Sequence, residues 1–184
     1  MPANDLYNLS NGKPVTSLTP YSFPTDEYHA AFADRVSVFL KHYTFEDGRV
    51  TTRTLTRGEF WDMACGVAGY LERLKLSKGT RIVHGFSSNN VFDAVFRLAE
   101  VPVGCTTVTI NWQADSDDTI IYKTRLAGAR VLVYDTGFQA RIAAIGSELK
   151  DVAIVNADDM GIGSANEVSS RSSTYDDERL IVFT

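Results

Sequence analysis

Apolar and polar residues alternate over residues 36–45, the first patterned stretch of the chain. A second stretch, residues 50–55, is rich in valine and threonine, and the pair Asp47-Gly48 lies between the two. An Asp-Gly pair in this position is typical of a tight hairpin turn, because both central turn residues need a positive φ. The pattern therefore predicts a β-hairpin that turns at Asp47-Gly48.

A long amphipathic helix is predicted directly after the hairpin. Thr56 and Glu59 have the spacing of a capping box, in which each side chain binds the backbone N–H of the other residue. Apolar residues then recur at helical spacing as far as Leu76. We expect a helix from Thr56 to about Leu76, with Phe60 and Trp61 packed in the core.

Short apolar runs alternate with helical stretches over the rest of the chain. Ser87, Ser88 and Asn89 are expected to cap the first of the later helices, whose apolar positions run to Ala99. The expected strands are 81–84, 105–110, 130–134, 152–155 and a buried final strand 180–184, and the further helices are 115–126 and 138–149. This order predicts an α/β fold: a mostly parallel sheet with helices on both faces, plus the N-terminal β-hairpin.

Two regions are expected along the chain. Residues 1–28 hold four of the five prolines and little periodicity, which indicates a lead-in arm. Residues 29–184 form the α/β unit, within which the polar stretch 157–179 is expected to be a loop.

Composition narrows the class of protein. The 184 residues include 18 basic and 23 acidic side chains, and the net charge of −5 gives no basic footprint for nucleic acid. No apolar run approaches the roughly 20 residues of a membrane span, and the first ten residues lack the apolar core of a secretory signal. Cys65 and Cys105 are expected to be reduced thiols of a cytoplasmic protein, although a disulfide between them stays open.

No single motif predicts catalysis. Gly161-Ile162-Gly163 resembles the start of a dinucleotide loop, but the third glycine and a following apolar helix are missing, so a surface turn is favoured. Ser87 lies at a strand-to-helix turn, the context of a nucleophile elbow, but Asn89 replaces the glycine that such an elbow requires. We interpret Ser87 as a helix cap rather than a nucleophile.

Histidines and acidic pairs have structural interpretations as well. His84 ends a strand at the carboxyl edge of the predicted sheet, where α/β proteins bind ligands, but a lone histidine is more often a satisfied structural residue. His42 falls on the predicted hairpin and His29 in the arm. The acidic pairs at 117–118, 158–159 and 176–177 are explained by helix capping and solvation, without a metal. We predict no catalytic residue and no metal ligand.

The order of the segments resembles the adenylate-forming (AMP-binding) superfamily, and acyl-CoA synthetases in particular. Residues 54–60 are similar to the family's L-T-Y-x-E-L stretch, residues 76–83 to V-K-K-G-D-R-V-A, and residues 128–133 to G-A-K-V-L-V. Residues 176–184 resemble the strand that leads into the family's phosphate loop, Y-T-S-G-T-T-G-x-P-K-G, and Thr184 matches the threonine that opens this loop. The resemblance covers about residues 34–184.

The resemblance implies an N-terminal portion of an ATP-dependent acid–CoA ligase of fatty acid metabolism. ATP, Mg²⁺, CoA and a small carboxylic acid would be its cofactors and substrates. Thr184 is the one expected cofactor-binding residue, because the family's loop and catalytic lysine lie beyond it. The 184-residue piece itself is expected to be inactive, to bind no cofactor, and to self-associate through its exposed apolar edge strand.

Two other functions stay open. The chain could be a doubly wound nucleotide- or partner-binding module without chemistry, in which case a flavodoxin-like sheet with a ligand at its switch point is expected. A small hydrolase built on Ser87 and His84 is the third hypothesis.

Overall fold

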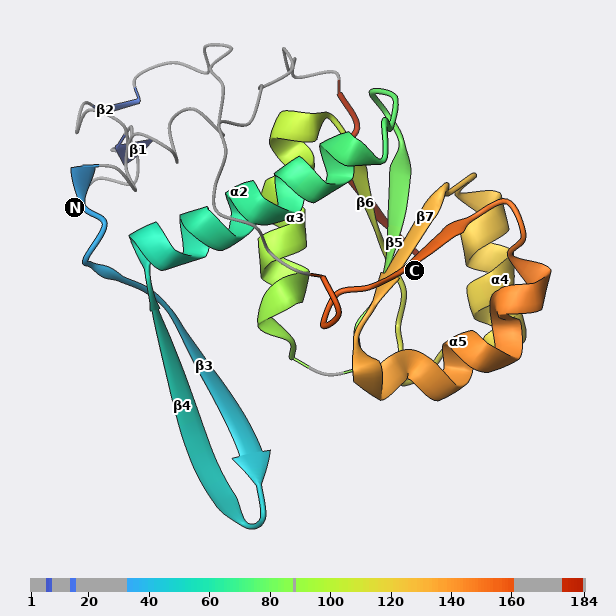
Figure 1. Ribbon diagram of the computed structural model, residues 1–184, viewed down its shortest axis with the longest axis horizontal. Coiled ribbons are helices and arrows are strands. Elements are labelled where there is room, and N and C mark those ends of the chain that lie inside the picture. Colours follow the sequence, from blue (N-terminus) through green and yellow to red (C-terminus); the bar gives the residue numbers. More distant parts are fainter. Residues whose placement is uncertain (1–5, 8–13, 16–32, 88, 161–176, 184) are drawn as a thin grey trace.

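The centre of the molecule is a five-stranded sheet with the strand order β8-β7-β5-β6-β9, and all its neighbouring strands are parallel (Figure 1). We analysed a computed structural model that describes residues 6–7, 14–15, 33–87, 89–160 and 177–183. The strands of the sheet are β5 (Arg81–Gly85), β6 (Thr106–Thr109), β7 (Val131–Tyr134), β8 (Ala153–Asn156) and β9 (Leu180–Val182). The expected α/β fold with a parallel sheet is confirmed.

Helices cover both faces of this sheet (Figure 1). They are α2 (Arg57–Arg73), α3 (Val91–Val103), α4 (Asp117–Leu126) and α5 (Gln139–Ile145), with the short 3₁₀ turns η1 (Thr136–Phe138) and η2 (Gly146–Glu148) on either side of α5. Ile82 packs with α2 and α3 on one face, whereas its neighbour Val83 packs with α4 and α5 on the other. This period of two along β5 gives the fold two apolar cores, one on each side of the sheet.

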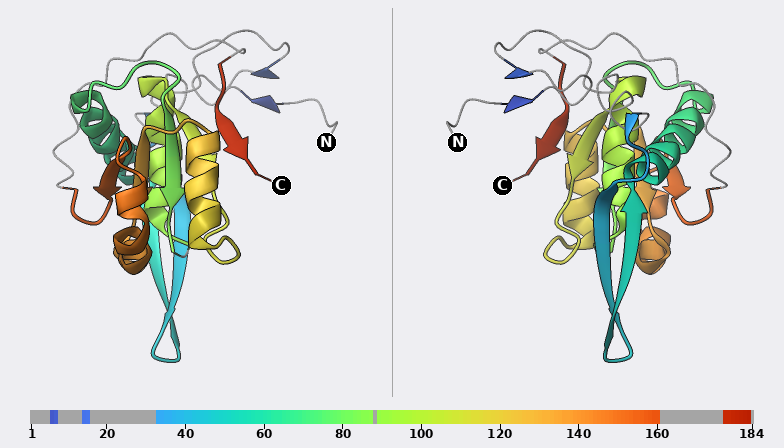
Figure 2. Two further views of the ribbon diagram at one scale, coloured as in Figure 1. Left: turned by 90° about the vertical axis from the view of Figure 1, so that its right-hand side faces the viewer. Right: turned by 90° about the vertical axis from the view of Figure 1, so that its left-hand side faces the viewer.

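The predicted hairpin consists of β3 (Val38–Glu46) and β4 (Arg49–Thr56), which pair antiparallel. Asp47 and Gly48 form its turn with φ of 50° and 74°, as the Asp-Gly pair predicts. Figure 2 shows the hairpin projecting from the body of the molecule. Phe45 and Val50, opposite each other in the register, are exposed. The hairpin therefore contacts the body mainly at its base.

The capping box at the start of α2 is present. The Glu59 N–H donates to Thr56 Oγ1 over 3.2 Å, and the Thr56 N–H donates to Glu59 Oε2 over 2.8 Å. Phe60 and Trp61 are both buried, as expected. The helix ends at Arg73 rather than near residue 76, because Lys75 adopts a left-handed conformation with φ of 54°.

Three expectations about local structure are wrong. Asn90, not Ser87 or Asn89, caps α3: its side chain accepts the Phe92 N–H over 2.9 Å. The helix expected over 138–149 is divided into α5 and η2, which meet at Gly146. The helix expected from residue 115 begins at Asp117, because Ser116 is its N-cap.

The final strand is not buried as expected. Leu180 is 49% and Val182 58% exposed, because β9 lies at one edge of the sheet and pairs, within the described residues, with β6 alone. In the arm, β1 (Leu6–Tyr7) pairs antiparallel with β2 (Pro14–Val15). The proposed boundary between residues 28 and 29, and most of the loop predicted over 157–179, lie outside the described residues.

Cys65 and Cys105 are free thiols, in agreement with the expectation of reduced cysteines. Within the described part of the chain, no helix has the length and apolar character that would let it cross a membrane.

Candidate functional site

The carboxyl edge of the sheet between β5 and β7 is the candidate site. The chain leaves β5 toward α3 on one face and leaves β7 toward α5 on the opposite face. Two neighbouring strands whose connections diverge in this way create the crevice in which open α/β sheets bind ligands. The first four strands also follow the flavodoxin order, but β9 joins beside β6 instead of beside β8. The sheet is therefore not a flavodoxin-like sheet.

A buried carboxylate lies at this edge of the sheet. Asp135, which directly follows β7 and is 4% exposed, accepts three hydrogen bonds. Its Oδ2 accepts the Ser87 backbone N–H over 3.0 Å and the Asn90 Nδ2–H over 3.2 Å. Its Oδ1 accepts the Phe138 backbone N–H over 3.1 Å, which caps η1. Asp135 thereby joins the loop after β5 to the loop after β7.

The two loops are in close contact at Gly137. A Cβ atom at this position would lie 2.2 Å from Ser87 Oγ and 3.1 Å from Ser87 Cβ. Only glycine fits here without displacing Ser87. The Ser87 side chain is therefore directed at the neighbouring loop.

The residues present do not fit a nucleotide phosphate at this crevice. Backbone N–H groups at such loops are common phosphate donors, and Asp135 already accepts those of Ser87 and Phe138. A phosphate would also place a second negative charge beside a buried carboxylate. We therefore derive no step of nucleotide chemistry from these residues.

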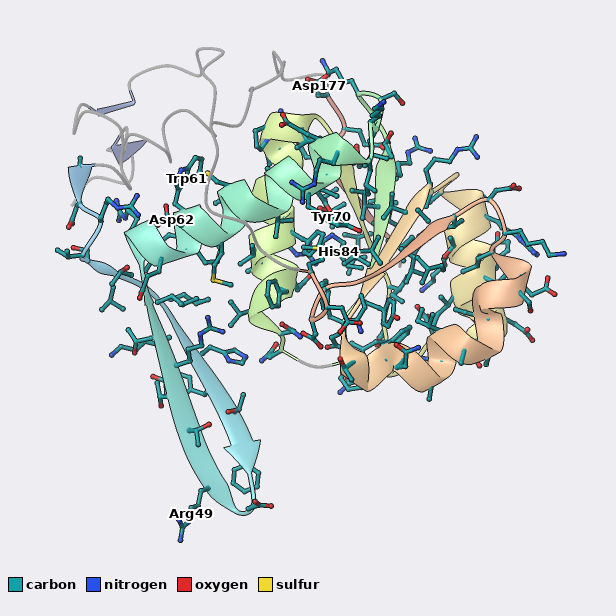
Figure 3. The ribbon with its side chains drawn as sticks, viewed as in Figure 1. Arg49, Trp61, Asp62, Tyr70, His84 and Asp177 are labelled. Atoms are coloured by element: carbon teal, nitrogen blue, oxygen red, sulfur yellow. The ribbon has the colours of Figure 1, made fainter. Side chains whose placement is uncertain are left out.

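His84, labelled in Figure 3, lies one residue before the end of β5 and belongs to a second, partly buried network. Its Nδ1 lies 2.6 Å from Asp93 Oδ1, and its Nε2 lies 2.7 Å from Glu100 Oε1. Glu100 also accepts a hydrogen bond from the Thr107 hydroxyl, and Asp93 accepts one from Arg97 Nε over 3.2 Å. The network joins β5, α3 and β6.

Both carboxylates act on the charge of His84. Burial alone lowers the pKa of His84, but the charges and hydrogen bonds of Glu100 and Asp93 outweigh burial and raise this pKa to about 9. For the carboxyl of Asp93, burial acts in the opposite direction and raises the pKa. The hydrogen bond and charge of His84, together with Arg97, outweigh burial and lower the pKa of Asp93 overall. His84 is therefore an imidazolium at neutral pH and donates both ring N–H groups.

This arrangement gives the hydrolase hypothesis no support. Each His84 ring nitrogen is bound to a carboxylate, so neither is available to accept a proton from Ser87. His42, in the middle of β3, is hydrogen-bonded to the backbone carbonyl of Asn89. His29 lies outside the described residues. The interpretation of His84 as a satisfied structural residue agrees with its contacts.

The other predicted residues are not gathered at one site. Thr184 and Gly161-Ile162-Gly163 lie outside the described residues. Asp158 accepts the Thr136 N–H over 2.8 Å. Asp117, in the first turn of α4, forms an ion pair with Arg141 of α5. Where the structure describes the chain, no group of three or more His, Cys, Asp or Glu side chains is arranged to hold a metal ion.

Glu100 and Asp135 are central to these networks, and the sequence-based prediction singles out neither. Glu100 occupies a position on the apolar stripe of α3, between Phe96 and Val103, and its side chain is 1% exposed. A carboxylate on such a stripe is a signal for a buried partner, and His84 is that partner. Asp135 has a weaker signal, an acid directly after a buried strand.

Comparison with solved structures identifies the fold. No family model matches the chain, and no curated protein matches its sequence. A Mycobacterium tuberculosis fatty acyl CoA synthetase superposes with a TM-score of 0.71 at 20% identity, over 86% of this chain and 31% of that one. The N-terminal domain of FACL13 from the same organism gives 0.72 at 18% identity, over 88% of this chain and 41% of that one.

Similar agreement is found with the Klebsiella oxytoca NpsA N-terminal subdomain in complex with anthranilyl-AMSN. Its TM-score is 0.68 at 18% identity, over 90% of this chain and 38% of that one. The chain thus spans between 31% and 41% of the length of these three structures. The chain has the fold of the N-terminal domains of adenylate-forming enzymes, the fold that its sequence resemblance implies.

Proposed function

We propose that residues 29–184 are the N-terminal scaffold of an ATP-dependent acid–CoA ligase, an AMP-forming acyl-CoA synthetase of the cytoplasm. One observation carries this proposal: the segments that resemble the family in sequence belong to a chain of which 86% superposes on a fatty acyl CoA synthetase with a TM-score of 0.71. Residues 54–60 lead into α2, residues 76–83 into β5, and residues 128–133 into β7.

The proposed reaction has two steps. A carboxylate attacks the α-phosphate of ATP, which forms an acyl-adenylate and releases pyrophosphate. The thiol of CoA then attacks the acyl carbon, which forms the thioester and releases AMP. Mg²⁺ and backbone N–H donors would offset the phosphate charge.

In this proposal the described residues support the reaction without touching its substrates. β9 is held beside β6 by the Thr106 hydroxyl, which donates to the Glu178 carbonyl over 2.8 Å, and by Arg81 Nε, which lies 2.8 Å from Glu178 Oε1. These contacts fix the direction in which β9 leads toward Thr184. The role of β9 is thus to aim a phosphate loop that Thr184 would open.

Residues 1–184 alone are proposed to be inactive. Their sequence contains no glycine-rich loop with a lysine of the Y-T-S-G-T-T-G-x-P-K-G kind. At the sheet edge between β5 and β7, the Asp135 carboxylate accepts the Ser87 N–H and the Asn90 side-chain N–H. Neither feature offers ATP a tight binding site.

The coding sequence beyond codon 184 and a pyrophosphate-release assay test this proposal together. We expect the codons after Thr184 to specify a Ser/Thr/Gly-rich loop with a lysine. The protein expressed with that segment should release pyrophosphate from ATP when a fatty or short-chain acid is added, whereas residues 1–184 should not. A continuation without the loop, or a longer protein that releases no pyrophosphate with any acid of the panel, contradicts the proposal.

A further inference from the structure

We propose that His84, Asp93 and Glu100 form a proton-dependent latch that holds the first turn of α3, and with it the loop before α3, against the sheet. The three side chains come from two elements, since His84 lies on β5 and both carboxylates on α3. The imidazolium between them is the only link that the described structure gives between Asp93 and β5. The inference concerns the fold itself and does not depend on the proposed ligase function.

The charged groups around His84 balance one another. From α3, Asp93, Glu100 and Arg97 contribute two negative charges and one positive charge, and the imidazolium supplies the second positive charge. From β6, Thr107 and Thr109 present hydroxyls to Glu100 and Arg97. The rings of Phe86 and Phe96 lie edge-on to the imidazole, and α2 and β7 add apolar side chains to the same core. The network is neutral only while His84 is protonated.

The two carboxylates differ in their access to water. Glu100 is 1% exposed, whereas the Asp93 side chain is 34% exposed. A neutral imidazole has one N–H and one acceptor nitrogen, so it can donate to only one carboxylate. Glu100 cannot be rehydrated at its buried position and must keep the remaining N–H, because an unpaired buried charge is costly. Asp93 is consequently the partner that is released.

Release of Asp93 acts on one end of α3. Asp93 retains Arg97, which lies on the same helix and contacts Thr109 Oγ1 of β6 over 3.4 Å, so Asp93 keeps an indirect link to the sheet but loses its direct contact. Asn90, three residues earlier, connects the start of α3 to Asp135. Loss of the His84 contact therefore loosens the first turn of α3 and the loop after β5, while Glu100 continues to hold the middle of the helix.

Hydrogen exchange and NMR on the 184-residue chain test the latch. The titration midpoint of the His84 side-chain resonances should lie at a pH well above that of a free histidine. Exchange rates are first corrected for the base-catalysed intrinsic rate. The corrected rate of amides in the first turn of α3 should then rise about tenfold between pH 7 and pH 10, relative to the corrected rate in the first turn of α4. Amides around Glu100 should change less than those around Asp93.

Variants separate the latch from a merely structural network. Asp93→Asn should abolish the pH dependence of exchange in the first turn of α3 and lower the pH at which His84 titrates. Asp118→Asn, which removes an exposed acid from the first turn of α4, is the matched control and should change neither property. If Asp93→Asn does not fold, Glu100→Gln should still lower the titration pH of His84. A titration of His84 that is unchanged in Glu100→Gln, or equal exchange in the two helices at every pH, overturns the proposal.

Discussion

The backbone N–H of Ser87 donates to Asp135 Oδ2 over 3.0 Å, although the two residues are 48 positions apart in the sequence. This contact links the two loops at the sheet edge where a doubly wound sheet would bind a ligand. Ser87 does not cap α3, because its side chain faces Gly137 in the loop after β7. At the sheet edge between β5 and β7, Asp135 thus holds the loop after β5 against the loop after β7.

The close approach of the two loops predicts an unusual sensitivity at Gly137. Gly137→Ala should destabilise the protein by about 1–3 kcal/mol, because its Cβ would lie 2.2 Å from Ser87 Oγ. Gly146→Ala is the control, since a Cβ there meets no atom within 4 Å among the described residues. Urea unfolding measures both. Equal stability of the two variants would contradict the packing described, whereas Ser87→Gly should restore part of the loss in Gly137→Ala.

The buried network predicts how stability depends on pH. The pKa of His84 is 6.5 in the unfolded chain and about 9 in the folded protein, so its stabilisation is complete below pH 6.5 and is lost as the pH rises to about 9. A single proton gives a slope of about 1.4 kcal/mol per pH unit in this window. The pKa of Asp93 is lowered in the folded protein. Its contribution to the free energy of unfolding is therefore present above the ordinary carboxyl range and is lost as the pH falls below that range. Urea unfolding between pH 6 and 9.5 should show the loss.

Two variants isolate this effect. His84→Leu leaves Glu100 buried without its counter-charge and should cost about 3–5 kcal/mol. The double variant His84→Leu/Glu100→Leu should recover most of this loss and should lose the slope between pH 6.5 and 9. If the double variant kept the slope, His84 would not be its source.

The capping box predicts a smaller effect at the base of the hairpin. Thr56→Ala removes the acceptor for the Glu59 N–H and should cost about 1 kcal/mol. Thr56→Ser keeps the hydroxyl and should stay within about 0.5 kcal/mol of the parent chain. Thermal unfolding of the three proteins compares them. A loss in Thr56→Ser as large as in Thr56→Ala would indicate that the methyl group, not the hydrogen bond, matters.

The exposed edge strand predicts that the 184-residue chain self-associates. Leu180 and Val182 are about half exposed, and β9, which pairs with β6 alone among the described strands, offers backbone groups to a second copy. Leu180→Lys/Val182→Lys should lower the apparent mass in sedimentation velocity. Phe45→Lys/Val50→Lys places the same charges on the hairpin and is the control. Self-association that only the hairpin variant reduces would assign the contact to β3 and β4 instead.

Local patterns predict much of this fold. The Asp47-Gly48 turn and the Thr56–Glu59 capping box depend on residues at most three positions apart, so their chemistry can be identified in the sequence alone. The alternation of strands and helices likewise predicts a parallel sheet. The C-terminal end of α2 is harder to predict from the sequence. It depends on the left-handed conformation of Lys75, and lysine seldom adopts this conformation.

The networks of the candidate site depend on contacts between distant segments. Nothing near Ser87 in the sequence indicates that its N–H will donate to Asp135 or that its side chain will face Gly137, while Asn90 caps α3. The exposure of β9 is a property of its position at the sheet edge, which its apolar sequence does not specify. Glu100 is the exception, since an acid on an apolar helical stripe predicts a buried partner.

Calorimetric titration of the purified 184-residue chain with ATP and Mg²⁺ tests the central claim most directly. If these residues are a scaffold whose sheet edge carries the buried Asp135 carboxylate instead of a phosphate site, the heat should show no saturable binding up to about 1 mM ATP. One-site binding with a Kd of about 1–10 µM would mean that the chain itself carries a nucleotide site, and would contradict the account.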